Sequence, residues 1–123
     1  MNNFESVVDL HLKSITERNF SSFSEFFHPS HSCIVILPNG NMIEGNADIL
    51  DFHKEWFKEM DWRIEYQKLN IFANGNVGYA LFDITYFDIE QNGSPYELKY
   101  LLSLLFINVD NKWVLIRDQN TLK

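Results

Sequence analysis

The first half of the chain repeats apolar residues with the spacing of α-helices. Phe4, Val8 and Ile15 belong to one apolar face, which predicts a helix over residues 3–18. Phenylalanines at helical spacing predict a second, shorter helical segment over residues 20–27, which ends because Pro29 forces the preceding residue out of the α-helical region. A third amphipathic pattern follows over residues 46–60, with Asn46 as the expected N-cap.

The second half has the pattern of β-strands. Residues 33–37 form a compact apolar run that is closed by the turn residues 38–40, and residues 62–67 alternate apolar and polar side chains. Long strands are expected over residues 77–89 and 96–109, because Asn92 and Gly93 between them favour a type I′ hairpin turn. A last strand over residues 112–120 closes the sheet. Helices followed by an antiparallel meander indicate an α+β fold.

One strand is apolar on both of its faces. Between residues 99 and 107 the even-numbered side chains are all apolar or aromatic, and the odd-numbered ones include Leu101, Leu105 and Ile107 around Ser103. An antiparallel sheet with one solvated face would alternate apolar and polar residues. The helices can cover one face, and a chain of 123 residues has little left for the other. We therefore expect a homodimer joined through the faces of two sheets.

Composition and charge restrict which partners and which cellular location are expected. A length of 123 residues fits a single domain over residues 1–123. The formal net charge of −7 would repel a phosphate backbone or an anionic membrane, so neither nucleic acid nor membrane is an expected partner. No signal peptide or long apolar run is visible, and the single cysteine, Cys33, has no partner for an internal disulfide. These features predict a cytoplasmic protein.

Four stretches together resemble a known superfamily. They are FSSFSEFFHPS at residues 20–30, CIVILPNGNMIEG at 33–45, GNVGYALFDI at 75–84 and WVLIRDQNT at 113–121. Their order resembles that of the nuclear transport factor 2-like superfamily, which includes SnoaL-like and ketosteroid isomerase-like proteins. The resemblance implies a cystatin-like α+β cone, in which N-terminal helices pack on a curved, mixed and mostly antiparallel sheet. Such cones serve isomerases, dehydratases, polyketide cyclases, epoxide hydrolases and non-catalytic association domains, so the fold leaves the function open.

The residues that perform steroid isomerisation in this superfamily are replaced here. The position of the catalytic base, just before a proline in the first strand, holds Leu37 before Pro38. The position of the tyrosine donor holds His11, and that of the protonated aspartate donor lies near Ser103. Steroid isomerase activity is therefore not implied.

Two histidines interrupt apolar helix faces. His11 lies among Val7, Val8 and Ile15, and the surroundings of His53 on its helix are equally apolar. In the fold that the chain resembles, both helices press these faces on the concave side of the sheet, so both imidazoles are expected to face a cavity. An imidazole is a good proton shuttle at neutral pH. The alternative is that each histidine is a core or rim residue hydrogen-bonded to a backbone carbonyl.

The last strand supplies the other candidate polar groups. Superfamily members similar to this chain often place a pocket residue about six positions after the strand's tryptophan, which is Gln119 here, with Arg117 on the same side. Arg117 would bind a carboxylate or an enolate, or alternatively would pair with Asp83 or Glu97 on a neighbouring strand. Asp118 is expected on the opposite face, and it becomes the base of the pocket if the alternation is reversed.

Large aromatic side chains are expected to line the cavity. The ligand-binding candidates are Trp56, Phe82, Tyr86, Tyr100 and Trp113. Aromatic residues of long strands also fill cores and dimer interfaces, and the eleven phenylalanines of the chain favour that alternative. The sequence has no phosphate loop and no dinucleotide fingerprint, so no cofactor is expected. His28, His31 and Cys33 lack an evident further ligand, so no metal site is expected.

Three functions remain open at this level. The first is a cofactor-independent isomerase, lyase or cyclase that acts by general acid–base catalysis on a small hydrophobic carbonyl or hydroxyl compound. His53 and His11 would move protons while Arg117 and Gln119 hold the developing oxyanion, and Asp118 would be the base if the alternation of the last strand is reversed. The second is a non-catalytic cup that binds the same kind of molecule. The third is a dimerisation domain whose cone is filled by side chains. The two histidines on inward helix faces narrowly favour the first two.

Overall fold

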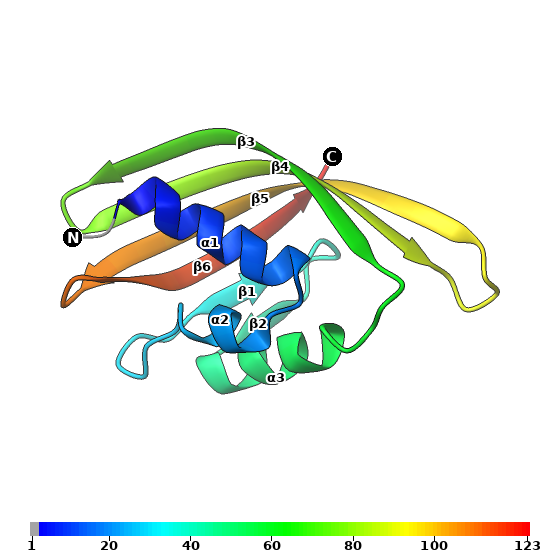
Figure 1. The fold of residues 1–123 in the computed structure, drawn as a ribbon, viewed down its shortest axis with the longest axis horizontal. Helices are drawn as coiled ribbons and strands as arrows, with labels where there is room; N and C mark the ends of the chain where they lie inside the picture. The colour runs from blue at the N-terminus through cyan, green and yellow to red at the C-terminus, as the bar shows by residue number, and fades with distance from the viewer. Residues whose placement is uncertain (1–2) are drawn as a thin grey trace.

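The computed structural model describes residues 3–123, in which helices pack on one curved, six-stranded sheet (Figure 1). The helices are α1 (Phe4–Thr16), α2 (Phe20–Ser24) and α3 (Asn46–Trp56). The strands are β1 (Ile34–Ile36), β2 (Met42–Glu44), β3 (Arg63–Asn74), β4 (Val77–Ile89), β5 (Pro95–Val109) and β6 (Lys112–Leu122). Within the described residues, every helix is too short or too polar to cross a membrane.

The sheet is mixed and mostly antiparallel, as predicted. Its strand order is β2-β1-β6-β5-β4-β3. The long strands β3 to β6 form three consecutive hairpins with antiparallel pairing, β1 and β2 also pair antiparallel, and only β1 and β6 run parallel among the described strands. The parallel pair joins the first strand of the chain to the last one. It brings Arg117, Asp118 and Gln119, in the polar end of β6, beside the three residues of β1.

Local sequence explains where the helices begin. The side chain of Asn3 caps α1 by accepting a hydrogen bond from the backbone N–H of Ser6 at 3.2 Å, and Asn19 caps α2 in the same way. The prediction for Asn46 is wrong, because this residue is the first residue of α3 and Gly45, at φ 94°, precedes it. The Asn46 amide instead binds backbone groups of the segment before β1.

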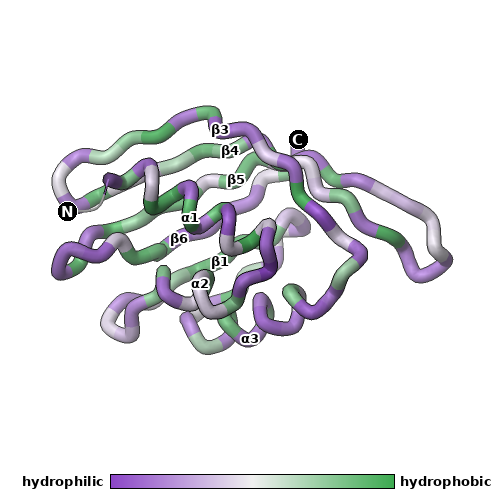
Figure 2. The backbone as a smooth tube through the Cα atoms, viewed as in Figure 1, coloured by the Kyte–Doolittle hydropathy of each residue, from purple (hydrophilic) through white to green (hydrophobic). Residues whose placement is uncertain are grey.

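The core lies between the helices and the concave face of the sheet. Phe4 of α1 contacts Phe106 and Trp113, with ring centroids 5.6 and 4.8 Å apart. Gly78 on β4 gives the Phe4 ring room to approach the sheet, because a Cβ atom at that position would overlap the ring. Figure 2 shows the corresponding hydrophobic segments along β4 and β5 beside α1, while much of α3 and the tip of the β4–β5 hairpin are hydrophilic.

Candidate functional site

A cavity of about 290 Å³ lies between the helices and the sheet. Its wall combines residues of both layers, which are Leu12, Ile15, Val35, Leu37, Pro38, Phe52, His53, Trp56, Ile64, Ile84, Tyr86, Tyr96, Leu98, Tyr100, Leu102, Asp118 and Asn120. Most of these side chains are aliphatic or aromatic. Among residues 3–123, no lysine or arginine lines the cavity. An apolar hollow with a few polar groups is the usual form of a small-molecule site.

A β-bulge in β6 decides which polar residues face this cavity. Leu105 of β5 pairs with Arg117, whereas the next residue, Phe106, pairs with Leu115, so Ile116 is an extra residue in β6. An extra residue shifts the two-residue alternation of a strand by one position. The faces predicted by counting from the tryptophan of this strand are therefore reversed beyond the bulge.

Asp118 and Asn120 face the cavity because of the bulge. Both residues line it, and only 6% of the Asp118 side-chain surface is exposed. The expectation that Asp118 faces away from the cavity is wrong, and the alternative parity is the one observed. Asp118 also lies beside Val35 in the parallel pairing of β1 with β6, so the first strand covers it from one side.

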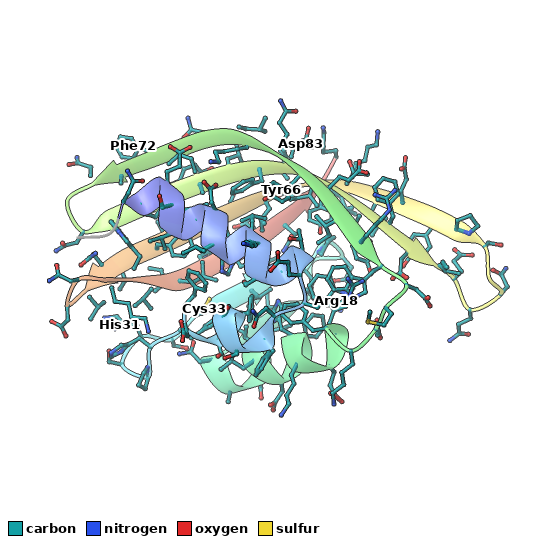
Figure 3. The ribbon with its side chains drawn as sticks, in the orientation of Figure 1. Arg18, His31, Cys33, Tyr66, Phe72 and Asp83 are labelled. Atoms are coloured by element: carbon teal, nitrogen blue, oxygen red, sulfur yellow. The ribbon has the colours of Figure 1, made fainter. Side chains whose placement is uncertain are left out.

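Arg117 and Gln119 lie outside the cavity. Both side chains are exposed, and neither contributes to the cavity wall. The prediction that they face the pocket is wrong for the same reason, because the bulge turns them to the opposite face of the sheet. Asp83, one partner considered for Arg117, forms its ion pair with Lys123 at 3.1 Å (Figure 3).

Only one of the two oxygens of the buried Asp118 carboxyl accepts a hydrogen bond from the described protein groups. The Asn120 side-chain N–H donates to Asp118 Oδ1 at 2.9 Å and to the Ile36 carbonyl oxygen at 2.7 Å. Within residues 3–123, no protein group donates a hydrogen bond to the other oxygen, Oδ2. Burial raises the pKa of Asp118 from 3.8 to about 7, and the hydrogen bond from Asn120 opposes this shift only in part. Such a carboxyl can both accept and release a proton near neutral pH.

Two tyrosine hydroxyls of the cavity wall differ in what they can donate. The Tyr86 hydroxyl donates its only proton to Asp88 Oδ2 at 2.5 Å. The Tyr100 hydroxyl has no hydrogen-bond partner within residues 3–123. Burial, and then the charge of Asp118, raises the pKa of Tyr100 above its ordinary value, so this hydroxyl stays protonated at neutral pH. Tyr100 is therefore a free donor in the same cavity as the titratable Asp118.

His53 lines the cavity, as predicted, and one of its nitrogens is held by the backbone, as in the alternative. Its Nδ1–H donates to the Ile49 carbonyl oxygen at 2.7 Å, and its ring stacks on Phe23 at 4.4 Å. Burial lowers the pKa of His53 to about 4, while the backbone hydrogen bond opposes that shift. The imidazole is therefore neutral at pH 7, with Nε2 as its hydrogen-bond acceptor.

His11 lies in the core rather than in the cavity wall. It is fully buried, and neither ring nitrogen has a hydrogen-bond partner within residues 3–123. Phe23, Phe26 and Phe106 surround it, with ring centroids between 4.8 and 5.7 Å away. Burial, with a smaller contribution from His53, lowers the pKa of His11 to about 3. The prediction that His11 faces the cavity is wrong, because phenylalanines of the α2 region cover the imidazole.

The five aromatic residues predicted to bind a ligand also divide between the cavity wall and the core. Trp56, Tyr86 and Tyr100 line the cavity. Phe82 is fully buried outside the cavity wall and contacts Tyr66, which is labelled on β3 in Figure 3, at a centroid distance of 5.6 Å. Trp113 is equally absent from the wall because it packs on the first turn of α1. These two aromatic residues belong to the core.

Several residues of the cavity wall were not predicted. Asn120 was missed together with the bulge, although it lies two residues after Asp118 and so shares its face. Tyr96 and Leu98 alternate with polar residues before Tyr100 on β5, and this alternation was a usable signal. Nothing in the described chain, residues 3–123, groups three or more His, Cys, Asp or Glu side chains where they would hold a metal ion.

Comparisons with known proteins agree on the fold. Among curated proteins, none matches the sequence. A candidate dehydratase of the nuclear transport factor 2-like family from Streptomyces avermitilis is similar in structure, with a TM-score of 0.80 and 9% identity over 98% of this chain and 93% of that one. The association domain of C. elegans CaMKII has a TM-score of 0.68 and 18% identity over 95% and 91% of the two chains.

A third solved structure and a family match complete the assignment. A Caulobacter vibrioides protein with a cystatin-like fold has a TM-score of 0.74 and 17% identity, over 98% of this chain and 87% of the other. The SnoaL-like domain family matches residues 5–119, which is nearly the whole chain. The superfamily resemblance predicted from the sequence is thereby confirmed. This chain belongs to the SnoaL-like domain family and has the nuclear transport factor 2-like fold.

Proposed function

We propose that this protein binds a small hydrophobic carbonyl or hydroxyl compound in the cavity and moves a proton on it, as a cofactor-independent isomerase, lyase or cyclase. The observation that carries the proposal is Asp118, a buried carboxyl with one unbonded oxygen on an apolar cavity and a pKa raised to about 7. A general base works best when its pKa is near the working pH. A carboxyl used only for packing would gain nothing from this placement.

The proposed reaction divides the work between two side chains. Asp118 Oδ2 takes a proton from a carbon next to the ligand's carbonyl, or from a hydroxyl group, and later returns it at another position. The Tyr100 hydroxyl donates a hydrogen bond to the oxygen that becomes negative, and a single such donor is worth roughly 100-fold to 1,000-fold in rate. His53 contributes a neutral acceptor nitrogen and orients the ligand. The candidate dehydratase from Streptomyces avermitilis shares the fold of this chain.

A ligand that enters the cavity should stabilise the native protein. We expect hits in a thermal-shift screen of small hydrophobic ketones, enones and alcohols, because a molecule that binds only the folded state raises its melting temperature. Leu37→Trp fills the cavity from its half-buried edge and should abolish these shifts. Leu10→Trp, the same change at a site on α1 that is 58% exposed, should preserve them. Shifts that persist in Leu37→Trp would place binding elsewhere.

We also propose that two copies pair through the convex face of the sheet. The side chains of Leu101, Leu105 and Ile107 lie on the face of β5 away from the cavity, and they remain only half-buried in the single chain. Leu81 on β4 pairs with Ser103 on the same face. A large apolar sheet face of this kind is typical of an interface. The similarity to the C. elegans association domain is in line with self-association.

The proposed dimer predicts a change in mass for one substitution. Leu105→Lys places a charge at the centre of the convex face and is expected to convert a dimer to a monomer in multi-angle light scattering, because an unpaired buried charge destabilises an interface strongly. Leu10→Lys adds the same charge on α1 and should leave the mass unchanged. A wild-type protein that is monomeric at high micromolar concentration would contradict the dimer and leave the cavity proposal untouched.

A further inference from the structure

The outer end of the cavity is built on the paired strands β4 and β5. Tyr86 on β4 and Tyr96 on β5 both line the cavity, and their ring centroids are 6.5 Å apart. Asp88 lies two residues after Tyr86, on the same face of β4, and pairs directly with Tyr96 across the two strands. Tyr96 is 36% exposed, whereas Asp118 is 6% exposed. The tyrosine pair therefore lies at the mouth, with Asp88 beside it behind the wall residues, and Asp118 lies at the inner end.

The Asp88 carboxylate is held in place without being neutralised. The Tyr86 hydroxyl donates to its Oδ2 at 2.5 Å, and the backbone N–H of Ile89 donates to its Oδ1 at 2.8 Å. Both donors are uncharged groups, and within residues 3–123 Asp88 forms no ion pair. The pKa of Tyr96 is raised by burial first, and then by the negative charges of Asp88, Glu90 and Glu59. The mouth of the cavity therefore has a negative potential.

Aromatic rings surround the same position. Trp56 lines the cavity with its ring centroid 6.3 Å from that of Tyr86. Trp62 stacks on Trp56 with ring centroids 4.0 Å apart, and the Cζ of Arg18 lies 4.0 Å from the Trp62 centroid (Figure 3). Arg18 also donates to the backbone carbonyl oxygen of Glu59 and contributes nothing to the cavity wall. Trp56, Tyr86 and Tyr96 thus face a cavity in which the described residues provide no cation.

The wall of this cavity offers an anionic ligand no cationic partner among residues 3–123. Asp118 lies at the inner end with an unbonded oxygen, and Asp88 lies at the mouth. Neither end offers a lysine or arginine side chain within residues 3–123. A cleft lined by charges of one sign raises the local concentration of ligands of the opposite sign. Aromatic faces attract ammonium groups through their quadrupoles, and most strongly where water is excluded.

We propose that the ligand of this cavity is a hydrophobic amine, whose protonated nitrogen lies at the mouth against Asp88 and the rings of Trp56, Tyr86 and Tyr96. The apolar body of the ligand fills the interior, and its reacting carbonyl or hydroxyl group reaches Asp118. This inference rests on the proposed function, because it assigns the ligand class of the same cavity. It concerns the charge of the ligand and is independent of the reaction that follows.

Three probes with one common body test the charge preference. They are 4-phenylbutylamine, which is protonated at neutral pH, 4-phenylbutan-1-ol, which is neutral, and 4-phenylbutanoate, which is anionic. Calorimetric titration at low salt should give the amine an affinity roughly 5-fold to 30-fold above that of the alcohol, which is the range of a partly to fully desolvated cation–π contact. The carboxylate should bind most weakly. Added salt should narrow the difference between amine and carboxylate.

Two matched substitutions test whether Asp88 causes the preference for the amine over the alcohol. Asp88→Asn keeps the acceptor for Tyr86 and removes the charge, so it should reduce the amine-to-alcohol ratio at least threefold. Asp110→Asn changes the net charge equally in the β5–β6 turn, at the opposite end of the sheet from the β4–β5 hairpin (Figure 1), and should leave the ratio unchanged. An unchanged ratio in Asp88→Asn would overturn the inference.

The outcome also separates this inference from the proposed function. If the alcohol binds at least as tightly as the amine, the amine assignment is wrong, while the cavity stands as a binding site for a neutral carbonyl or hydroxyl compound. If none of the three probes binds, and the wider screen also gives no thermal shift, the amine assignment and the proposed ligand site are both contradicted.

Discussion

Asp118→Asn is expected to abolish proton transfer and leave ligand affinity nearly unchanged. Asparagine has almost the same shape and keeps an acceptor for Asn120, but it has no basic oxygen. A positioned general base contributes roughly 100-fold to 10,000-fold to a rate. With a ketone or enone from the screen, the loss is measurable by NMR as the rate at which solvent deuterium replaces the hydrogen on the carbon activated by the ligand's carbonyl.

Two further variants serve as controls for the exchange rate of Asp118→Asn. Asp110→Asn removes one charge outside the cavity and should keep the wild-type exchange rate. Tyr100→Phe removes the proposed oxyanion donor and should slow exchange less than Asp118→Asn, with a similar affinity. Exchange at the wild-type rate in Asp118→Asn would show that another group is the base. His53 would then be the next residue to substitute, because its imidazole lines the cavity with Nε2 as an acceptor.

At about pH 8, Asp118→Asn is also expected to be more stable than the wild type by about 4 kcal/mol. The pKa of Asp118 is about 7 in the folded protein and near 3.8 in the unfolded chain, a difference worth roughly 1.4 kcal/mol per pH unit. The native state keeps the proton that the unfolded chain releases in this interval. The contribution of Asp118 to the stability of the wild type is therefore fully present below the unfolded pKa of 3.8 and is lost as the pH rises through about 7.

The stabilities of the wild type and Asp118→Asn must be compared over a range of pH, because the buried histidines change stability with pH in the opposite direction to Asp118. The pKa values of His11 and His53 are lowered to about 3 and about 4, so they contribute stability above about pH 6.5 that is lost as the pH falls. Both proteins contain both histidines, so the histidine contributions cancel in the difference between the two free energies of unfolding. Urea unfolding should show equal stability of the two proteins near pH 4 and a growing advantage of Asp118→Asn up to pH 8. A difference that is independent of pH would contradict the account.

Much of the architecture was predictable because it depends on local periodicity. The apolar spacing around Phe4 and Val8 fixes the buried face of α1, and the dipeptide Asn92 and Gly93 marks the hairpin between the two longest strands. The two apolar faces predicted for β5 are present: Leu102 and Leu104 belong to the face that is buried in the chain, and the opposite face is half-buried. These features require only the geometry of one helix or one strand at a time.

The candidate site was less predictable because it depends on contacts between elements. The bulge at Ile116 arises from the register of β6 on β5, and no glycine or proline in the strand marks it. It reverses the assignments of Asp118 and Gln119 at once. The placement of His11 depends on how the phenylalanines near α2 pack over α1, which the spacing within α1 does not contain. Both errors come from tertiary packing.

The measurement that tests the account most directly is the titration of Asp118 itself. In protein labelled with ¹³C at aspartate carboxyl carbons, the Asp118 signal can be assigned by its absence from Asp118→Asn and followed from about pH 3 to 9. The account predicts a midpoint near 7, and a ligand in the cavity should displace it. A midpoint near the ordinary value of about 4 would mean that the carboxyl is solvated, and it would contradict Asp118 as the acid–base group of this cavity.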